Sequence, residues 1–169
     1  MKVAETARLS LRHLALSDAA FMCRLLNEPS WLLNIGDRGV RTPADAERYI
    51  ETTALQMYQR LGFGMYLLES KPDAEPIGLC GLVKRDSLPD ADLGFALLSE
   101  FWGQGYAFEA SAAVMAHART AFGLPRLLAI VTPTNQPSIN LLEKLGFRFQ
   151  QMIRTISTGE NLKLYAATT

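Results

Sequence analysis

The sequence is poor in cysteine, carries no net charge and lacks long apolar runs, and each of these absences excludes a class of protein. Only two of its 169 residues are cysteines, Cys23 and Cys80, and their spacing matches no metal-binding or redox motif. We therefore expect two reduced thiols in or near the core. Seventeen basic residues balance seventeen acidic ones, which argues against a nucleic-acid binder driven by phosphate attraction.

Signals for secretion, membrane insertion and the best-known nucleotide folds are also missing. The first eight residues contain no apolar segment typical of a signal peptide, and the longest apolar runs are too short to span a bilayer. No G-x-G-x-x-G motif is present, and no Walker A motif. We expect a cytoplasmic protein without a membrane partner. Its length, with 49% apolar and 20% charged residues, predicts one globular domain over residues 1–169.

The most informative stretch runs from Asp92 to Ser111. Leu93–Leu98 is an apolar run that predicts a strand, Trp102–Ala107 predicts a turn, and residues 107–121 predict a helix of small side chains. Glycines in such a turn let the backbone approach a ligand, and the helix N-terminus adds free N–H groups and partial positive charge. By itself the turn leaves two interpretations open: a phosphate-binding loop, or an ordinary tight connection between strand and helix.

The rest of the chain alternates between helical and strand patterns, which predicts a mixed α/β domain with one central sheet. Before the central stretch we expect a strand at Ala7–Leu14, a helix from Ser17 to Asn27 stopped by Pro29, an irregular loop at Trp31–Val40, a helix from Thr42 to Leu61, and strands at Met65–Glu69 and Ile77–Val83. After it we expect a strand at Arg126–Val131, a helix at Asn135–Lys144, and strands at Phe147–Ile156 and Asn161–Ala166 around a turn at Ser157–Glu160.

Three motifs, at residues 102–110, at 135–138 with 143–147, and at 8–12, resemble those of the GNAT superfamily of N-acetyltransferases, and most closely its branch of ribosomal-protein alanine and serine N-acetyltransferases. Trp102–Ala110 is similar to the branch's Trp-Gly-x-Gly-Tyr-Ala-x-Glu-Ala pyrophosphate loop. Asn135–Ser138 with Glu143–Phe147 is similar to its Asn-x-x-Ser and Glu-Lys-Leu-Gly-Phe motifs, and Arg8–Arg12 to its first strand. The resemblance covers essentially the whole chain.

The resemblance implies a single domain whose mostly antiparallel sheet splays into a V, with helices on both faces and acetyl-CoA in the V. The pantetheine arm would add to the free edge of the strand predicted at Leu93–Leu98 through backbone hydrogen bonds, as a peptide does. Trp102 could instead be a packing residue that shapes the loop. The acetyl-CoA-binding residues implied are Ala96, Leu97, Leu98, Trp102, Gly103, Gln104, Gly105, Tyr106, Ala107, Phe108, Asn135 and Ser138.

The resemblance also implies two catalytic side chains and no metal. Asp92 matches the acidic position that helps remove the amine proton, and its alternative is a solvated aspartate at a strand edge. Ser138 could protonate the departing thiolate or be an ordinary polar residue of a first helical turn. Relatives commonly have a Tyr acid where this chain has Leu142, so that role is not carried over. The backbone N–H of Leu97 or Leu98 is the expected oxyanion donor.

The acceptor side is expected to be roofed by the first two helices and the loop between them. Asp37 could pair with a cationic amine, and Arg38 or Arg41 with a carboxylate; the alternative for each is a solvated loop charge. The candidate acceptor-binding residues are Trp31, Asn34, Asp37, Arg38, Arg41 and Tyr66.

The function that follows is acetyl transfer from acetyl-CoA to a primary amine, on a protein N-terminus or a small molecule. The expected partners are acetyl-CoA and the amine, with no nucleic acid and no membrane, and the protein is expected to be a monomer or a homodimer. The absence of Tyr at Leu142 leaves one alternative open, a non-catalytic acyl-CoA-binding sensor module.

Overall fold

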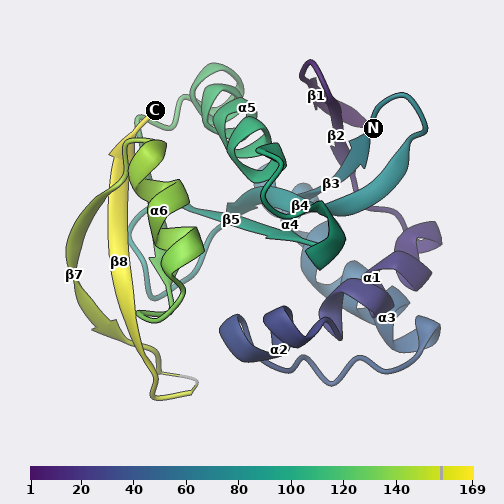
Figure 1. Ribbon diagram of the computed structural model, residues 1–169, viewed down its shortest axis with the longest axis horizontal. Coiled ribbons are helices and arrows are strands. Elements are labelled where there is room, and N and C mark those ends of the chain that lie inside the picture. Colours follow the sequence, from purple (N-terminus) through teal and green to yellow (C-terminus); the bar gives the residue numbers. More distant parts are fainter. Residues whose placement is uncertain (157) are drawn as a thin grey trace.

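A computed structural model describes residues 1–156 and 158–169 and contains an eight-stranded sheet with helices on both faces (Figure 1). The strand order is β1-β2-β3-β4-β5-β6-β8-β7. Every pair of neighbours is antiparallel except β5 and β6. The predicted mixed α/β fold is therefore confirmed. Ser157, the first residue of the predicted last turn, lies outside the described residues.

The elements have the following bounds. The strands are β1 (Lys2–Glu5), β2 (Leu9–His13), β3 (Met65–Ser70), β4 (Glu75–Val83), β5 (Asp92–Leu97), β6 (Arg126–Val131), β7 (Arg148–Arg154) and β8 (Asn161–Thr168). The α-helices are α1 (Ala19–Leu26), α2 (Pro29–Asn34), α3 (Pro43–Ile50), α4 (Gln56–Leu61), α5 (Tyr106–Phe122) and α6 (Gln136–Lys144). Two 3₁₀ turns, η1 (Leu16–Asp18) and η3 (Ser99–Phe101), and one π-helical stretch, η2 (Glu51–Leu55), complete the set.

Two features of the amino-terminal half differ from the sequence prediction. Residues Lys2–Glu5 form an edge strand that pairs antiparallel with β2 and had no counterpart in the prediction. The predicted irregular loop at Trp31–Val40 begins as a helix, because Pro29 opens α2 rather than only ending the helix before it. A proline is well tolerated in the first helical turn, where its missing N–H would have had no partner.

The long helix predicted from Thr42 to Leu61 is present, but its middle turn is π-helical. Thr42 caps α3 by accepting a hydrogen bond from the backbone N–H of Asp45. η2 then connects α3 to α4, and Gly62, with φ of 78°, ends the run in the left-handed conformation. The start and end signals were read correctly, and the π-helical stretch has no simple sequence signature.

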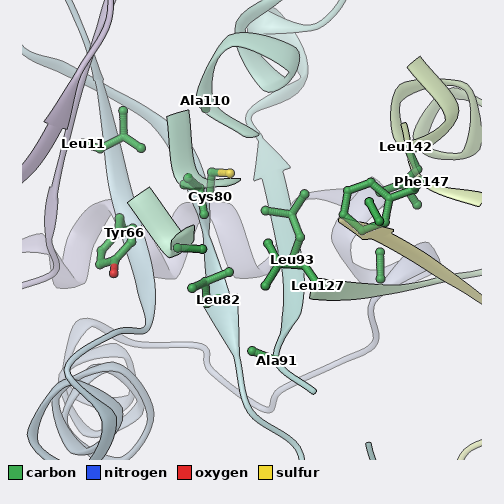
Figure 2. Packing of buried hydrophobic residues seen from close by; sticks show 14 of the residues in the cluster. Leu11, Tyr66, Cys80, Leu82, Ala91, Leu93, Ala110, Leu127, Leu142 and Phe147 are labelled. Atoms are coloured by element: carbon green, nitrogen blue, oxygen red, sulfur yellow. The ribbon is translucent and has the colours of Figure 1, made fainter. Parts of the chain in front are cut away.

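Two apolar clusters attach helices to opposite faces of the sheet. One cluster joins α5 to the face that carries Cys80 and Leu93, and Figure 2 shows its central side chains. The other joins α1 and α3 to the face that carries Leu79 and Ala96. Because side chains alternate along a strand, adjacent residues such as Leu79 and Cys80 belong to different layers. This assignment decides which strand residues can reach the acceptor side.

The functionally important feature of the sheet is the divergence of β5 and β6. The two strands are paired at one position, Asp92 with Leu128, next to a hydrogen bond from the N–H of Leu128 to the carbonyl of Ala91. Beyond this point β6 continues to pair with β8, whereas β5 turns toward α5. One edge of β5 is therefore left without a strand partner along most of its length, as the predicted V requires (Figure 1).

Candidate active site

The open edge of β5 presents alternate backbone groups to the gap beside β6. The N–H of Leu98 donates to the carbonyl of Ile77 at 2.9 Å, so it points toward β4. Leu98 is therefore the wrong choice as an oxyanion donor, since its N–H already has a partner. Backbone N–H groups alternate in direction along a strand, which turns the N–H of Leu97 toward the gap. Leu97 remains the predicted donor.

The loop after β5 combines two left-handed glycines with a helix N-terminus. Gly103 and Gly105 have φ of 71° and 82°, a region that other residues rarely adopt. A Cβ atom added to Gly103 would meet nothing within 4 Å, so the backbone conformation, not lack of space, requires glycine there. Gly105 is also the N-cap of α5, and it has no side chain to accept from the first-turn N–H groups. A loop of this kind fits a bound pyrophosphate.

Arg8 and Glu109 hold this loop in place through hydrogen bonds and an ion pair. Glu109 Oε2 accepts from Arg8 Nε at 2.7 Å, and its Oε1 accepts from the backbone N–H of Arg8 at 2.9 Å and from the hydroxyl of Thr6. Arg8 Nη1 donates to the carbonyl of Gln104 at 2.8 Å, and its guanidinium lies 4.4 Å from the ring centroid of Tyr106. Two of the recognised motifs, at residues 8–12 and 102–110, thus meet in one hydrogen-bonded unit.

Trp102 ties the start of the loop to the end of β5. Its indole N–H donates to the carbonyl of Leu97 at 3.0 Å, while 53% of the residue is exposed. The contact supports the interpretation of Trp102 as a residue that shapes the loop. It also occupies one acceptor on the open edge of β5.

Asp92 lies at the point where β5 and β6 separate, and it is buried. Only 1% of the residue is exposed, so the solvated strand-edge interpretation is wrong. Arg85 Nε donates to its two carboxylate oxygens at 3.2 and 3.4 Å. Burial raises the pKa of Asp92 to about 6, and the guanidinium of Arg85 opposes this shift. A carboxylate with a pKa near 6 is ionised at neutral pH and is a better proton acceptor than an ordinary aspartate.

The first turn of α6 contains the other two predicted polar groups. Asn135 caps this helix, because its Oδ1 accepts from the backbone N–H of Ser138 at 3.3 Å. That bond leaves the side-chain amide N–H₂ of Asn135 available for a ligand. Leu142 is buried in the same core cluster as Phe147 (Figure 2). The position where relatives have a Tyr is here part of the core.

Two of the three charged residues predicted on the acceptor side pair with each other. Asp37 forms an ion pair with Arg41, which also donates to Asn27 Oδ1 at 3.0 Å. Asp37 and Arg41 therefore stabilise the loop between α2 and α3. Arg38 is exposed, and no carboxylate of the described residues lies within 4 Å of its guanidinium.

A small cavity of about 230 Å³ separates α2 from the start of β8. Asn34 lines it, and the carbonyl of Asn34 accepts from the hydroxyl of Thr132 at 3.0 Å, which links α2 to the end of β6. Trp31 is not part of the cavity wall; it is 7% exposed, and its indole N–H has no partner among the described residues. The complete lining is Leu32, Leu33, Asn34, Ile35, Gly36, Thr132, Glu160, Asn161 and Leu162.

Tyr66 was wrongly predicted to contact the acceptor. It is fully buried on the α5 face of the sheet, opposite Cys80 (Figure 2). Its ring packs edge-on against His117. The sequence shows that Tyr66 lies in a strand but does not show which face that strand residue takes. On the same sheet, the partly exposed His13 stacks on Tyr58 with ring centroids 3.8 Å apart.

Arg85 and Tyr49 are residues that the sequence did not single out. Arg85 lies in the loop before β5, and only the structure shows that its guanidinium reaches Asp92. Tyr49 belongs to α3 and packs in the same cluster as Ala96. Burial raises the pKa of Tyr49, and the guanidiniums of Arg38 and Arg85 counteract part of that rise. Tyr49 thus belongs to the layer on the α1 and α3 side of the sheet.

Two further searches of the described residues gave negative results. Within them, no three side chains of the His, Cys, Asp or Glu type gather closely enough to hold a metal ion. No helix of the described chain combines the length and the apolar character needed to cross a membrane.

A sheet that opens beside β5, a glycine loop on the N-terminus of α5 and a buried carboxylate where β5 and β6 separate are the features that the resemblance implied. The chain belongs to the acetyltransferase (GNAT) domain family, whose model matches residues 8–148. It is an acyltransferase enzyme of this family, as the resemblance implied.

Several known proteins are similar over nearly the whole chain. An uncharacterized N-acetyltransferase, p20 of Bacillus licheniformis, is 32% identical over 158 residues, which cover 91% of this chain and 86% of p20. The crystal structure of an acetyltransferase from Agrobacterium tumefaciens is 25% identical with a TM-score of 0.82, covering 100% of this chain and 95% of that one. RimL, a ribosomal L7/L12 α-N-protein acetyltransferase solved in complex with coenzyme A, has a TM-score of 0.84 at 19% identity, covering 99% and 98%.

Proposed function

We propose that this enzyme transfers the acetyl group of acetyl-CoA to a primary amine, on a protein N-terminus or a small molecule. One observation carries the proposal: the gap beside β5 runs from the buried carboxylate of Asp92 to the glycine loop at Gly103 and Gly105. A donor that lies along this gap has its phosphates at one end and its reactive carbon near a base.

The donor site is supported by groups of three kinds. The amides of residues 103–108 with the N-terminus of α5 suit the pyrophosphate. The open edge of β5 suits the amides of the pantetheine arm, with Leu97 presenting its N–H there. The side-chain amide of Asn135 is a third donor, on the opposite wall. When bound, acetyl-CoA supplies an activated thioester, and the chain itself orients it.

The acceptor amine must lose a proton before or during attack. A free alkyl amine has a pKa near 10 and a peptide α-amine one near 8, so most of either is protonated at neutral pH. Asp92 is the base we propose, directly or through water, since burial gives it a pKa of about 6. Arg85 then acts as a positioning residue, because its Nε holds both carboxylate oxygens.

The remaining steps use backbone and hydroxyl groups. We propose that the N–H of Leu97 stabilises the negative oxygen that forms on the reacting carbon. Ser138, in the first turn of α6, is the candidate proton donor to the departing sulfur. Because a free thiol has a pKa near 8.5, the sulfur could also leave as thiolate without a protein acid.

The similarity to RimL favours peptide α-amines as the first acceptors to test, since that protein is described as an α-N-protein acetyltransferase. We also propose that the enzyme works in the cytoplasm, as a monomer or a homodimer and without a metal. The free thiols of Cys23 and Cys80 support a reducing compartment.

The test is thiol release from acetyl-CoA, followed colorimetrically with a panel of peptides and small amines, with mass spectrometry of the acceptor. We expect thiol release that depends on the acceptor and an acceptor that gains one acetyl group. Thermal melting with and without acetyl-CoA is the binding control. Stabilisation by acetyl-CoA with no turnover on any acceptor would contradict the proposed function and favour a sensor.

A further inference from the structure

The cavity between α2 and the start of β8 is bordered by apolar side chains that the fold leaves exposed. Of the nine residues that line it, four are leucine or isoleucine: Leu32, Leu33, Ile35 and Leu162. The first three, on α2 and at its C-cap, are exposed. An exposed apolar patch on a folded domain commonly marks a surface that contacts a ligand or a partner. The cavity is therefore a candidate binding site.

Hydrogen bonds hold one wall of this cavity next to a residue that is proposed to contact the donor. Thr132, directly after β6, donates from its hydroxyl to the carbonyl of Asn34 at 3.0 Å. The carbonyl of Thr132 accepts from the backbone N–H of Asn135 at 2.9 Å. Asn135 is the residue whose side-chain amide is proposed to bind acetyl-CoA. The cavity and the proposed donor site thus share the turn at residues 132–135.

The cavity also lies on the same side of the sheet as Asp92. Asp92 pairs with Leu128 of β6, and paired residues of neighbouring strands point to the same side. Leu128 packs with Leu164 of β8 in a cluster that is separate from the one that attaches α5. Leu162, two residues before Leu164, faces the same way and lines the cavity. This side, opposite to α5, is the one that carries α1, α2 and α3 (Figure 1).

The separation between Asp92 and the cavity indicates which acceptors can reach both. Leu128 lies beside Asp92, and Thr132 of the cavity wall lies four residues further along the chain. Four extended residues span about 13 Å, so a peptide needs about four residues to cover the same distance. A free amino acid or a short alkyl amine is too small to place its nitrogen at Asp92 and its other end in the cavity.

The size and the charge of the cavity narrow the class of group that fits. Its volume, about 230 Å³, is below the range of about 300–1,000 Å³ that is typical of sites for drug-sized ligands, so it has room for one large side chain. Glu160 is the one charged residue among the nine that line it, and its Oε2 accepts from the hydroxyl of Thr158 at 3.1 Å. An acidic side chain would be repelled there, whereas an apolar one would cover the exposed leucines.

We propose that this cavity binds an apolar side chain from the second, third or fourth residue of a peptide acceptor. The inference rests on the proposed function and specifies its substrate class: peptides with a free α-amine and an apolar residue shortly after it, in preference to small amines. The α-amine would lie near Asp92, and the chain would run along the side of the sheet opposite to α5 toward α2.

The experiment compares C-terminally amidated tetrapeptides that all begin with alanine, so that their α-amines have closely similar pKa values. Tetra-alanine is the reference, and leucine or glutamate replaces alanine at position two, three or four. We expect kcat/KM for one leucine peptide to be at least about tenfold above that for tetra-alanine, because burial of the larger apolar side chain favours binding by a factor of this size. Glutamate at the same position should give no increase. Leucinamide, which is too short to span the distance, should be a poorer acceptor than the best leucine peptide.

The double variant Leu33→Ser with Ile35→Ser tests the cavity wall. The two residues are 81% and 41% exposed, so the substitutions remove little buried area and should leave the fold intact, which thermal melting checks. We expect kcat/KM for the best leucine peptide to fall about tenfold, mainly through KM. The values for tetra-alanine and the KM for acetyl-CoA should stay unchanged. Leu16→Ser, in η1 at a residue that is 44% exposed, is the matched control and should change none of these values.

Three results contradict the inference, and they can be told apart. If the wild type turns over the leucine peptides no faster than tetra-alanine or leucinamide, the cavity does not select an apolar residue. If the double variant slows tetra-alanine as much as the leucine peptide and changes the mass found by sedimentation velocity, the exposed patch is a contact between two copies of the chain. If no acceptor gives thiol release although acetyl-CoA stabilises the protein, the proposed function fails and the inference fails with it.

Discussion

Arg8 and Glu109 are 101 residues apart in the chain and form an ion pair with an Nε–Oε2 distance of 2.7 Å. The pair connects the segment between β1 and β2 to the first turn of α5, which directly follows the glycine loop. The same guanidinium reaches the carbonyl of Gln104 inside that loop. The segment between β1 and β2 therefore does more than connect two strands, because it fixes the loop that is proposed to bind phosphate.

The variant Glu109→Gln should weaken acetyl-CoA binding more than it slows catalysis. It removes the charge that holds Arg8, while the side chain keeps its size. Because a charge-assisted hydrogen bond contributes about 1.5–3 kcal/mol, we expect the KM for acetyl-CoA to rise roughly tenfold. The kcat at saturating acetyl-CoA should stay within about twofold. Steady-state kinetics with acetyl-CoA as the varied substrate measures both quantities.

The matched control is Arg24→Gln, which breaks the exposed ion pair between α1 and Glu100. Exposed pairs of this kind contribute little to stability, so the control should leave the KM for acetyl-CoA unchanged. An unchanged KM in Glu109→Gln as well would show that the loop keeps its geometry without Arg8.

Burial of Asp92 should lower the stability of the protein at neutral pH. Its folded pKa, about 6, lies above the ordinary value of 3.8, so between these values the folded state binds more protons than the unfolded state. The stabilising effect of protonation is present at low pH and is lost as the pH rises through 6. Asp92→Asn should therefore raise the free energy of unfolding at pH 7.5 by up to about 3 kcal/mol.

The same substitution should have little effect near pH 2.5, because that pH lies well below both the folded and the ordinary pKa and Asp92 is then almost entirely neutral in both states. Urea unfolding of the wild type and Asp92→Asn at several pH values measures the difference. A variant that is less stable than the wild type at pH 7.5 would show that the ion pair with Arg85 outweighs the cost of burial.

Burial of the two histidines should make the protein less stable as the pH falls, which is the opposite of the effect of Asp92. Burial lowers the pKa of both, and the positive charges of the N-terminal amine and of His117 lower the pKa of His13 further. A histidine whose folded pKa is lowered stabilises the fold fully above its ordinary value of 6.5, and this contribution is lost as the pH falls below it. The double variant His13→Gln with His117→Gln should show a shallower fall in melting temperature between pH 7 and pH 5 than the wild type. Equal slopes would show that neither imidazole is shielded from water.

The two thiols should differ in reactivity. Cys80 is fully buried beside Ser111, and burial raises the pKa of its thiol to about 12, so almost no reactive thiolate is present at neutral pH. Cys23, on α1, is partly exposed. Titration of native protein with a thiol reagent should modify Cys23 alone, and the variant Cys23→Ser should react only after denaturation. Reaction of native Cys23→Ser would mean that the core opens around Cys80. The same variant removes a background signal from assays of thiol release.

Much of the fold could be predicted because its signals are local. The β6 bounds Arg126–Val131 agree with the apolar run, and the caps at Thr42, Asn135 and Gly62 mark helix ends through their own backbone chemistry. The failures arose where the outcome depends on distant residues. Lys2–Glu5 forms a strand because it pairs with the edge of β2. The sequence of the segment alone does not reveal that partner.

The candidate site shows the same difference between features with local sequence signals and features that depend on distant residues. The glycine loop and Asp92 follow from motifs, since their spacing is contiguous in the sequence. Arg85, Tyr49 and the pair of Asp37 with Arg41 involve side chains whose directions depend on packing. Tyr66 was assigned to the wrong layer because a shift of one residue along a strand changes the face.

The most direct test of the proposed chemistry is the pH dependence of kcat/KM for acetyl transfer by the wild type, Asp92→Asn and Arg85→Gln. For the wild type we predict acceptor-dependent thiol release that declines as the pH falls through about 6. Asp92→Asn should lower the rate about 100-fold or more, the usual contribution of a positioned base, and should lose the decline near pH 6. Arg85→Gln should move that decline to higher pH, because the guanidinium lowers the pKa of Asp92. A rate in Asp92→Asn close to that of the wild type, with the same pH profile, would contradict the assignment of Asp92 as the base.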